Sequence, residues 1–236
     1  MTSTIPRTAV LLPGTGSDEV FVRAVFARPL AALGIELLAP APPPGKALAE
    51  GYFAELDRLA AAHGPLLAGG ISFGAHLAAE WAVRAPGRCR GLLAALPAWH
   101  GAPGPAPAAL AATLSADLVA RHGVEGALAQ AATGSPPWLA AELGRAWRRH
   151  GNDLAASLRA AASRPAPSLA ALGVLSFPAG IATCVDDPVH PTKVAQEWAG
   201  ALPRAAVVET TLTALGTDRE SLGRATVLAW LRAARG

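Results

Sequence analysis

The sequence predicts an α/β fold, in which a mostly parallel sheet of about six strands is flanked by helices. Short apolar runs of strand length alternate along the chain with segments whose apolar residues recur at helical spacing, a pattern typical of parallel sheets covered by helices. The chain has 236 residues, of which 52% are hydrophobic and 16% charged. It is therefore long enough for one domain with a buried core.

The expected strands are the short apolar runs, several of them bounded by glycine or proline. The first, TAVLLPG, ends in a Pro-Gly turn, and PLLAGG and PAGIATCV have the same buried-strand composition. In chain order the strands are expected over residues 8–14, 34–40, 65–70, 89–97, 178–185 and 205–212.

Helices are expected between these runs. Ser17 can cap a helix whose apolar residues share one face. Over 46–62, apolar residues at helical spacing lie opposite charged ones, which indicates an amphipathic helix. Further helices are expected over 73–86, 192–202 and from about 219 to 234, whereas TALGTDRES, before the last helix, is expected to be a loop.

The region 98–170 differs in composition from the rest. It is rich in alanine, is broken by GAPGPAPAA and GSPPW, and lacks a strand-like run. We expect three or four short helices, inserted as a lid into a core formed by 1–97 and 171–236. Within the insertion, RAWRRHG (145–151) gathers three arginines around a tryptophan; it fits the solvated face of a lid helix better than a site for an anionic carrier-bound thioester, and His150 is expected to be solvated too.

Composition argues against several function classes. The net charge is only +3 and the arginines are scattered, so nucleic-acid binding is not expected. The start of the chain does not resemble a signal peptide, and the longest uncharged stretch, 169–185, is too short and too interrupted to span a membrane. Cys89 and Cys184 show no metal-ligand spacing and are typical of reduced packing residues in a cytoplasmic protein. We expect no metal or cofactor, and the sequence does not indicate an oligomeric state.

Ser72 lies between an expected strand and an expected helix, in GGISFGAHLAAEWA. In Gly70-Ile71-Ser72-Phe73-Gly74, a tight turn would strain the serine backbone and bring together the side chains two positions away on either side. Glycines remove that collision, and the hydroxyl is left at a helix N-terminus, where the dipole favours developing negative charge. The strand–turn–helix placement favours Ser72 as a nucleophile over an incidental serine in a turn.

This pattern resembles the α/β-hydrolase superfamily over nearly the whole chain, with Gly70–Gly74 matching its nucleophile elbow. The resemblance implies that Thr15, in LLPGTGSD, and Phe73 donate backbone N–H groups to an oxyanion. It also implies that the acid of the triad lies in VDDPVHP, with Asp187 before the proline as the match and Asp186 as the alternative. We expect the family's first two strands to be missing and the sheet to be correspondingly smaller.

The family's histidine between the last strand and the last helix is missing. No histidine follows His190, and Thr217 occupies roughly the expected position, although its hydroxyl is no general base. His190, three residues after Asp187, and His100, at the start of the insertion, are the two relocated candidates, with His190 favoured. His76, one helical turn beyond Ser72, fits a structural role.

The sequence thus favours a serine hydrolase that acts on a small-molecule carboxylic ester or thioester through Ser72. The alternative is a protein of the same fold that is impaired as a hydrolase, binding a ligand or performing lyase- or cyclase-type chemistry. An imidazole within hydrogen-bond reach of Ser72 would support the first hypothesis.

Overall fold

Six parallel strands form the central sheet in the computed structural model, which describes residues 6–235. Their order is β2-β1-β3-β4-β5-β6, and each neighbouring pair is parallel. The bounds are β1 (Thr8–Leu12), β2 (Glu36–Leu38), β3 (Leu66–Ile71), β4 (Cys89–Ala95), β5 (Ala179–Cys184) and β6 (Ala205–Thr210). The predicted fold class is confirmed.

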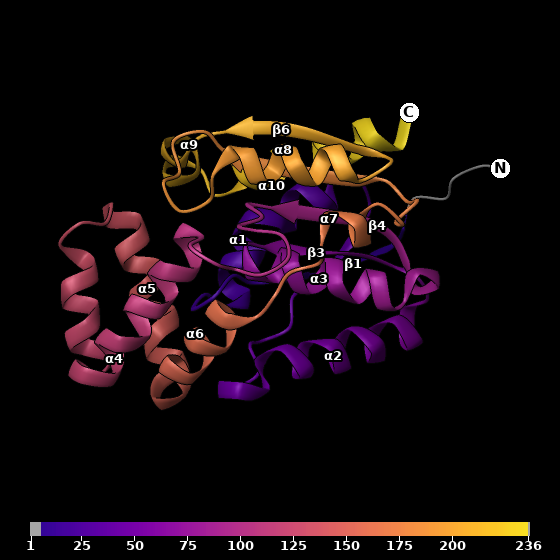
Figure 1. The fold of residues 1–236 in the computed structure, drawn as a ribbon. Helices are drawn as coiled ribbons and strands as arrows, with labels where there is room; N and C mark the ends of the chain where they lie inside the picture. Colours follow the sequence, from indigo (N-terminus) through magenta and orange to yellow (C-terminus); the bar gives the residue numbers. More distant parts are fainter. Residues whose placement is uncertain (1–5, 236) are drawn as a thin grey trace.

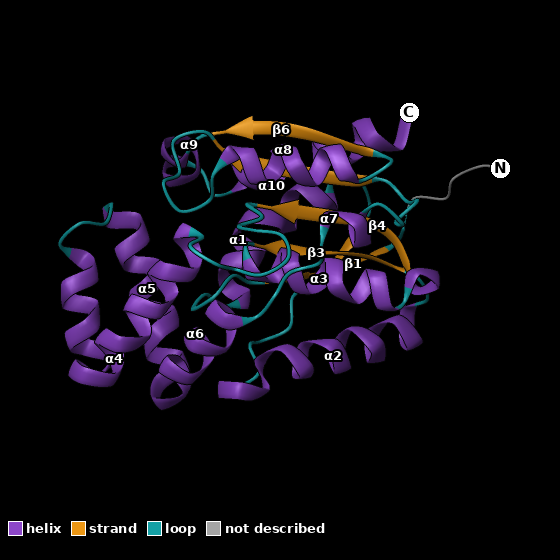
Figure 2. Ribbon diagram, in the orientation of Figure 1, coloured by secondary structure: helices purple, strands orange, loops and turns teal. Residues whose placement is uncertain are grey.

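Helices cover both faces of this sheet (Figure 2). One face packs against α1 (Glu19–Ala31) and α10 (Glu220–Arg235), with Phe26 and Trp230 buried between helix and sheet. The helices on the other face are α2 (Leu48–His63), α3 (Phe73–Arg84), α7 (Leu169–Leu172) and α8 (Thr192–Ala201). Each large apolar side chain buried in these two layers stabilises the fold by about 1.5–3 kcal/mol.

The chain between β4 and β5 is helical. It contains α4 (Pro107–Ala132), α5 (Pro137–His150) and α6 (Leu154–Ser163). Gly123, with φ 69°, kinks α4, and α4 packs along α6. These helices lie beside the end of the sheet to which the strand arrows point (Figure 1), which is where Ser72 follows β3.

Two helix starts differ from the prediction. Asp18, not Ser17, caps α1, because its Oδ1 accepts from the N–H groups of Val20 and Phe21. The strand expected over 205–212 ends at Thr210, and α9 (Leu212–Thr217) replaces most of the expected loop, with the Thr211 hydroxyl accepting from Ala214 N–H. The part of the chain that the structure describes also contains three short 3₁₀ helices: Gly45–Ala47, Pro86–Arg88 and Gly151–Asp153.

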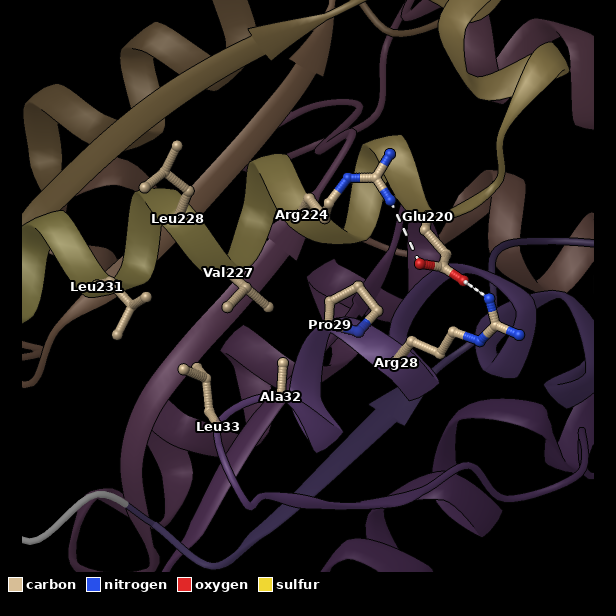
Figure 3. A pocket seen from close by; sticks show the side chains of 9 residues that line it. All are labelled: Arg28, Pro29, Ala32, Leu33, Glu220, Arg224, Val227, Leu228 and Leu231. Atoms are coloured by element: carbon tan, nitrogen blue, oxygen red, sulfur yellow. Dashed lines mark hydrogen bonds and ion pairs between the residues drawn. The ribbon is translucent and has the colours of Figure 1, made fainter.

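A shallow apolar groove of about 370 Å³ runs between α1 and α10 (Figure 3). Leu33, Leu228 and Leu231 line it, and Glu220 pairs with Arg28 and Arg224 at one end. None of the site residues expected from the sequence lines this groove. No helix within residues 6–235 is both long and apolar enough to cross a lipid bilayer.

Candidate active site

Ser72 forms the turn between β3 and α3. Its φ of 52° and ψ of −116° are unfavourable for a residue with a side chain, and its N–H donates to Ala95 O at 2.8 Å. A Cβ on Gly70 would lie 2.4 Å from Leu12 O, and one on Gly74 would lie 2.2 Å from the same atom. Only glycine fits at both positions, so the sequence around Ser72 is what allows so sharp a turn.

Asp187 and His190 lie on the segment that follows β5. The Asp187 Oδ1 accepts from Val189 N–H at 2.7 Å and from His190 N–H at 3.2 Å, which closes a tight turn of the Asx type. The other oxygen, Oδ2, lies 2.7 Å from His190 Nδ1. Because the turn folds the chain back on the carboxylate, two residues only three apart can face each other.

His190 also reaches Ser72. Its Nε2 lies 2.9 Å from Ser72 Oγ, so Asp187, His190 and Ser72 form one continuous hydrogen-bonded chain. With Asp187 ionised, Nδ1–H donates to the carboxylate and Nε2 accepts the serine proton. The Asp187 side chain is only 5% exposed and that of His190 is 15% exposed, so the hydrogen bond between them is largely shielded from water.

Hydrogen bonds to the Asp187 carboxylate stabilise its ionised form. Burial would raise the pKa of Asp187, but the His190 imidazole and the N–H groups of Val189 and His190 outweigh it and hold that pKa below its usual range. Asp187 is therefore ionised at neutral pH. Burial, with the nearby carboxylates of Asp187 and Asp186, raises the pKa of the Cys184 thiol to about 12. Cys184 is consequently a poor nucleophile.

The loop after β1 lies against the turn at Ser72. A Cβ on Gly14 would be 3.4 Å from Ser72 Cβ, so Thr15 follows a residue in contact with the elbow. Phe73 is the first residue of α3, where backbone N–H groups have no intrahelical acceptor. Within residues 6–235, neither the Thr15 nor the Phe73 N–H donates to a backbone carbonyl.

His76 is a buried structural histidine. Its Nε2 accepts from the N–H groups of Ala98, at 3.0 Å, and Trp99, at 3.4 Å, and its ring stacks on Trp198. Burial, together with the nearby His190, lowers the pKa of His76 to about 3. The imidazole is therefore neutral at physiological pH, and its lone pair is already used by the backbone.

The other positions considered for a base lie in different surroundings. His100 Nε2 is 3.2 Å from Glu197 Oε2, on α8. Thr217 is exposed at the end of α9, and its hydroxyl donates to Thr213 O at 3.0 Å. Among the histidines of the described chain, it is His190 whose ring contacts the Ser72 hydroxyl.

Asp186, the alternative acid, is hydrogen-bonded to the start of α9. Its Oδ1 accepts from Leu212 N–H at 2.6 Å and its Oδ2 accepts from the Thr213 hydroxyl at 3.4 Å. These contacts tie the segment after β5 to the start of α9. The two adjacent carboxylates are thus engaged with different parts of the fold.

The arginine-rich run of α5 is a solvated helix face only in part, because Arg148 and Arg149 are exposed but the tryptophan and the histidine contact the rest of the protein. Trp147 is 4% exposed, and His150 Nε2–H donates to Ser17 O at 3.0 Å. The three arginines each pair with a carboxylate: Arg145 with Asp18, Arg148 with Glu125 and Arg149 with Glu19. Sequence reasoning missed these pairs because the partners lie far apart in the chain.

No group of metal-ligating side chains that could hold an ion occurs among residues 6–235.

Solved structures resemble the chain, although no family model and no curated protein sequence matches it. MenH from S. aureus matches with a TM-score of 0.73 at 15% identity, over 99% of this chain and 96% of that one. The enol-lactonase from Burkholderia xenovorans LB400 gives 0.72 at 18% identity, over 98% and 93%. A thermophilic esterase from Thermogutta terrifontis gives 0.69 at 19% identity, over 97% and 90%. At these identities the likeness shows a shared fold.

Proposed function

The chain has the α/β-hydrolase fold, and we propose that it is a serine hydrolase that cleaves a small-molecule carboxylic ester or thioester through Ser72. One observation carries this proposal: the hydrogen-bonded chain from Asp187 through His190 to Ser72, with contacts of 2.7 and 2.9 Å. A serine becomes a competent nucleophile when an oriented base accepts its proton.

In the proposed reaction, Ser72 Oγ attacks the carbonyl carbon while His190 Nε2 takes the hydroxyl proton. The Asp187 carboxylate orients the ring and stabilises the imidazolium. The carbonyl oxygen becomes an oxyanion, which accepts from the N–H groups of Thr15 and Phe73. His190 returns the proton to the departing alcohol or thiol, and a water molecule then releases the acid from Ser72 by the same steps.

The inserted helices fit the role of a lid over this reaction. Trp147 of α5 and Leu158 of α6 both come within van der Waals reach of Gly16, in the loop that carries Thr15. Such cover would exclude bulk water and strengthen the hydrogen bonds to the oxyanion. We also propose a cytoplasmic location, since Cys89 and Cys184 are both buried, unpaired thiols.

The alternative function, ligand binding or non-hydrolytic chemistry on this fold, rested on the lack of a base in the family's usual position. The His190 contact with Ser72 supplies an imidazole from another loop and therefore favours the hydrolytic proposal. The alternative remains an outcome of the test below.

A fluorophosphonate probe tests the proposal. We expect one covalent adduct per chain, mapped by peptide mass analysis to Ser72, with turnover of p-nitrophenyl acetate and of an acetyl thioester. Ser72→Ala should lose both the adduct and turnover. Ser163→Ala, an exposed serine that bonds only to its own helix backbone, is the matched control and should behave as the parent. A folded parent that takes no label and hydrolyses neither compound would favour the alternative function.

A further inference from the structure

Helix α5 contacts the four consecutive residues that follow Thr15, Gly16 to Glu19. Trp147 Nε1 lies 3.0 Å from the Cβ position of Gly16, and His150 donates to Ser17 O. The next two residues form ion pairs with the same helix: Asp18 with Arg145, and Glu19 with Arg149. The α5 side of the insertion therefore packs against residues 16–19 and is hydrogen-bonded and ion-paired to them.

The contact between Arg145 and Asp18 has the most demanding geometry of the four. Arg145 Nη2 donates to Asp18 Oδ1 at 2.7 Å and Nε donates to Oδ2 at 3.1 Å, a two-point bond in which both carboxylate oxygens are used. The Asp18 side chain is 1% exposed. Burial would raise the pKa of Asp18, but Arg145 and the α1 backbone N–H groups outweigh it and lower that pKa. The carboxylate is thus charged and buried, and depends on Arg145 for its counter-charge.

Asp18 connects helix α5, through its ion pair with Arg145, to the start of α1 and so to the loop that precedes it. Its Oδ1 also accepts from Val20 and Phe21 N–H, so one carboxylate fixes both the start of α1 and the position of α5. Three residues earlier in the chain, Thr15 carries the N–H assigned to the oxyanion. A donor of this kind works only within about 2.7–3.1 Å of the oxyanion. Thr15 lies in a turn that Ser17 N–H closes by donating to Gly14 O at 3.1 Å. No strand or helix lies between Gly14 and Asp18, so the placement of this turn depends on its two ends, which lie against Ser72 and at Asp18.

We propose that Arg145 is a positioning residue for the reaction, acting through Asp18 to hold the Thr15 N–H toward the oxyanion. This inference rests on the proposed function and deepens it, because it couples the seating of the inserted helices to stabilisation of the transition state. Arg145 itself touches no reacting atom. Since the oxyanion exists only after attack, loss of Arg145 lowers kcat more than it changes KM.

The test compares three variants of the full chain. Arg145→Gln removes the counter-charge, and Arg145→Lys keeps the charge but cannot form the two-point bond. Arg148→Gln is the matched control: Arg148 is on the same helix, but its partner Glu125 is exposed and on α4. Each variant is assayed for kcat and KM with p-nitrophenyl acetate, for fluorophosphonate labelling of Ser72, and for hydrogen exchange of the peptide that contains residues 14–19.

We expect Arg145→Gln to lower kcat about 10-fold or more with KM within about 3-fold, a fraction of the roughly 10²–10³-fold effect of losing an oxyanion donor outright. Arg145→Lys should fall between it and the parent, exchange at 14–19 should rise in step, and Arg148→Gln should match the parent. An unchanged kcat in both Arg145 variants, or an equal loss of kcat in Arg148→Gln, would overturn the inference. In either case, labelling of the parent at Ser72 would still support the proposed function. A parent that neither labels nor turns over would overturn both. Arg145→Lys, the milder change, keeps the test decisive if Arg145→Gln folds poorly.

Discussion

The segments that follow β4 and β5, residues 96–101 and 185–191, leave adjacent parallel strands at the same edge of the sheet. In the first, the backbone N–H groups of Ala98 and Trp99 donate to the buried ring of His76. In the second, the chain turns around the Asp187 carboxylate, and the ring of His190 lies between this carboxylate and Ser72.

The structural imidazole and the candidate base differ in the partner of Nε2, which is a pair of backbone N–H groups for His76 and the Ser72 hydroxyl for His190. The lone pair of His76 is used by the backbone, and burial lowers the pKa of that ring to about 3. His190 has a carboxylate at Nδ1, which leaves Nε2 to accept the proton of Ser72. His100, which lies on the first segment, contacts Glu197 instead. The predictions below test this division.

The largest effect is expected from Asp187→Asn. The amide can no longer accept from the ring as an anion and would favour the wrong tautomer of His190, so turnover should fall by about 10⁴-fold. Steady-state hydrolysis of p-nitrophenyl acetate measures this. Asp186→Asn is the control, because Asp186 contacts the start of α9. Equal losses in the two variants would contradict the assignment of the acid.

A smaller effect, on stability, is expected from His76→Ala. It leaves two buried N–H groups without an acceptor, which should lower the free energy of unfolding by about 1–3 kcal/mol for each group. Urea unfolding measures this. A loss under about 0.5 kcal/mol, less than even one unpaired buried N–H group should cost, would contradict the structural role.

The pH dependence of stability tests whether His76 is buried in its neutral form. His76 has an ordinary pKa of 6.5 when unfolded and about 3 when native, so between these values the unfolded chain binds more protons. The contribution of His76 is complete above pH 6.5 and is lost as the pH falls, by about 1.4 kcal/mol per pH unit. His76→Gln, which does not titrate, should show a flatter profile between pH 6.5 and 4.5. Parallel profiles for parent and variant would count against a buried, neutral His76.

The smallest effect is expected from Asp186→Ala. Loss of the acceptor for Leu212 N–H at the start of α9 should cost about 1 kcal/mol of stability, as for other helix caps. Turnover should stay close to that of the parent, because His190 is oriented by the neighbouring carboxylate. Thermal unfolding and ester hydrolysis of the same preparation check both parts, and a large loss of turnover would place Asp186 in the reaction.

Much of the fold could be predicted because its determinants are local. The six strands are short apolar runs, and the turn at Ser72 is set by Gly70 and Gly74 within five residues. The helix α9 was missed because its start depends on Thr211 and on Asp186, which is 26 residues away in the chain. Likewise, Ser17 was the predicted cap of α1, but the adjacent Asp18 is also a capping residue type and is the residue whose side chain accepts from the helix.

The arrangement around Ser72 depends on contacts between distant residues. His190 lies 118 residues from Ser72, and its ring direction follows from the turn that Val189 N–H closes on Asp187, which no periodicity reveals. The sequence therefore left His190 and His100 open. Asp18 and Arg145 are 127 residues apart, so their contact had no sequence signal beyond opposite charge.

The most direct test of the central claim, that His190 is the base for Ser72, is the pH–rate profile of His190→Ala beside His100→Ala and the parent. The account predicts that His190→Ala loses at least ~100-fold in turnover together with the acidic limb of the profile, the usual signature of a lost general base. His100→Ala should keep the parental rate and profile. Parental behaviour of His190→Ala would contradict the claim, and loss of the acidic limb in His100→Ala would move the base to the segment after β4.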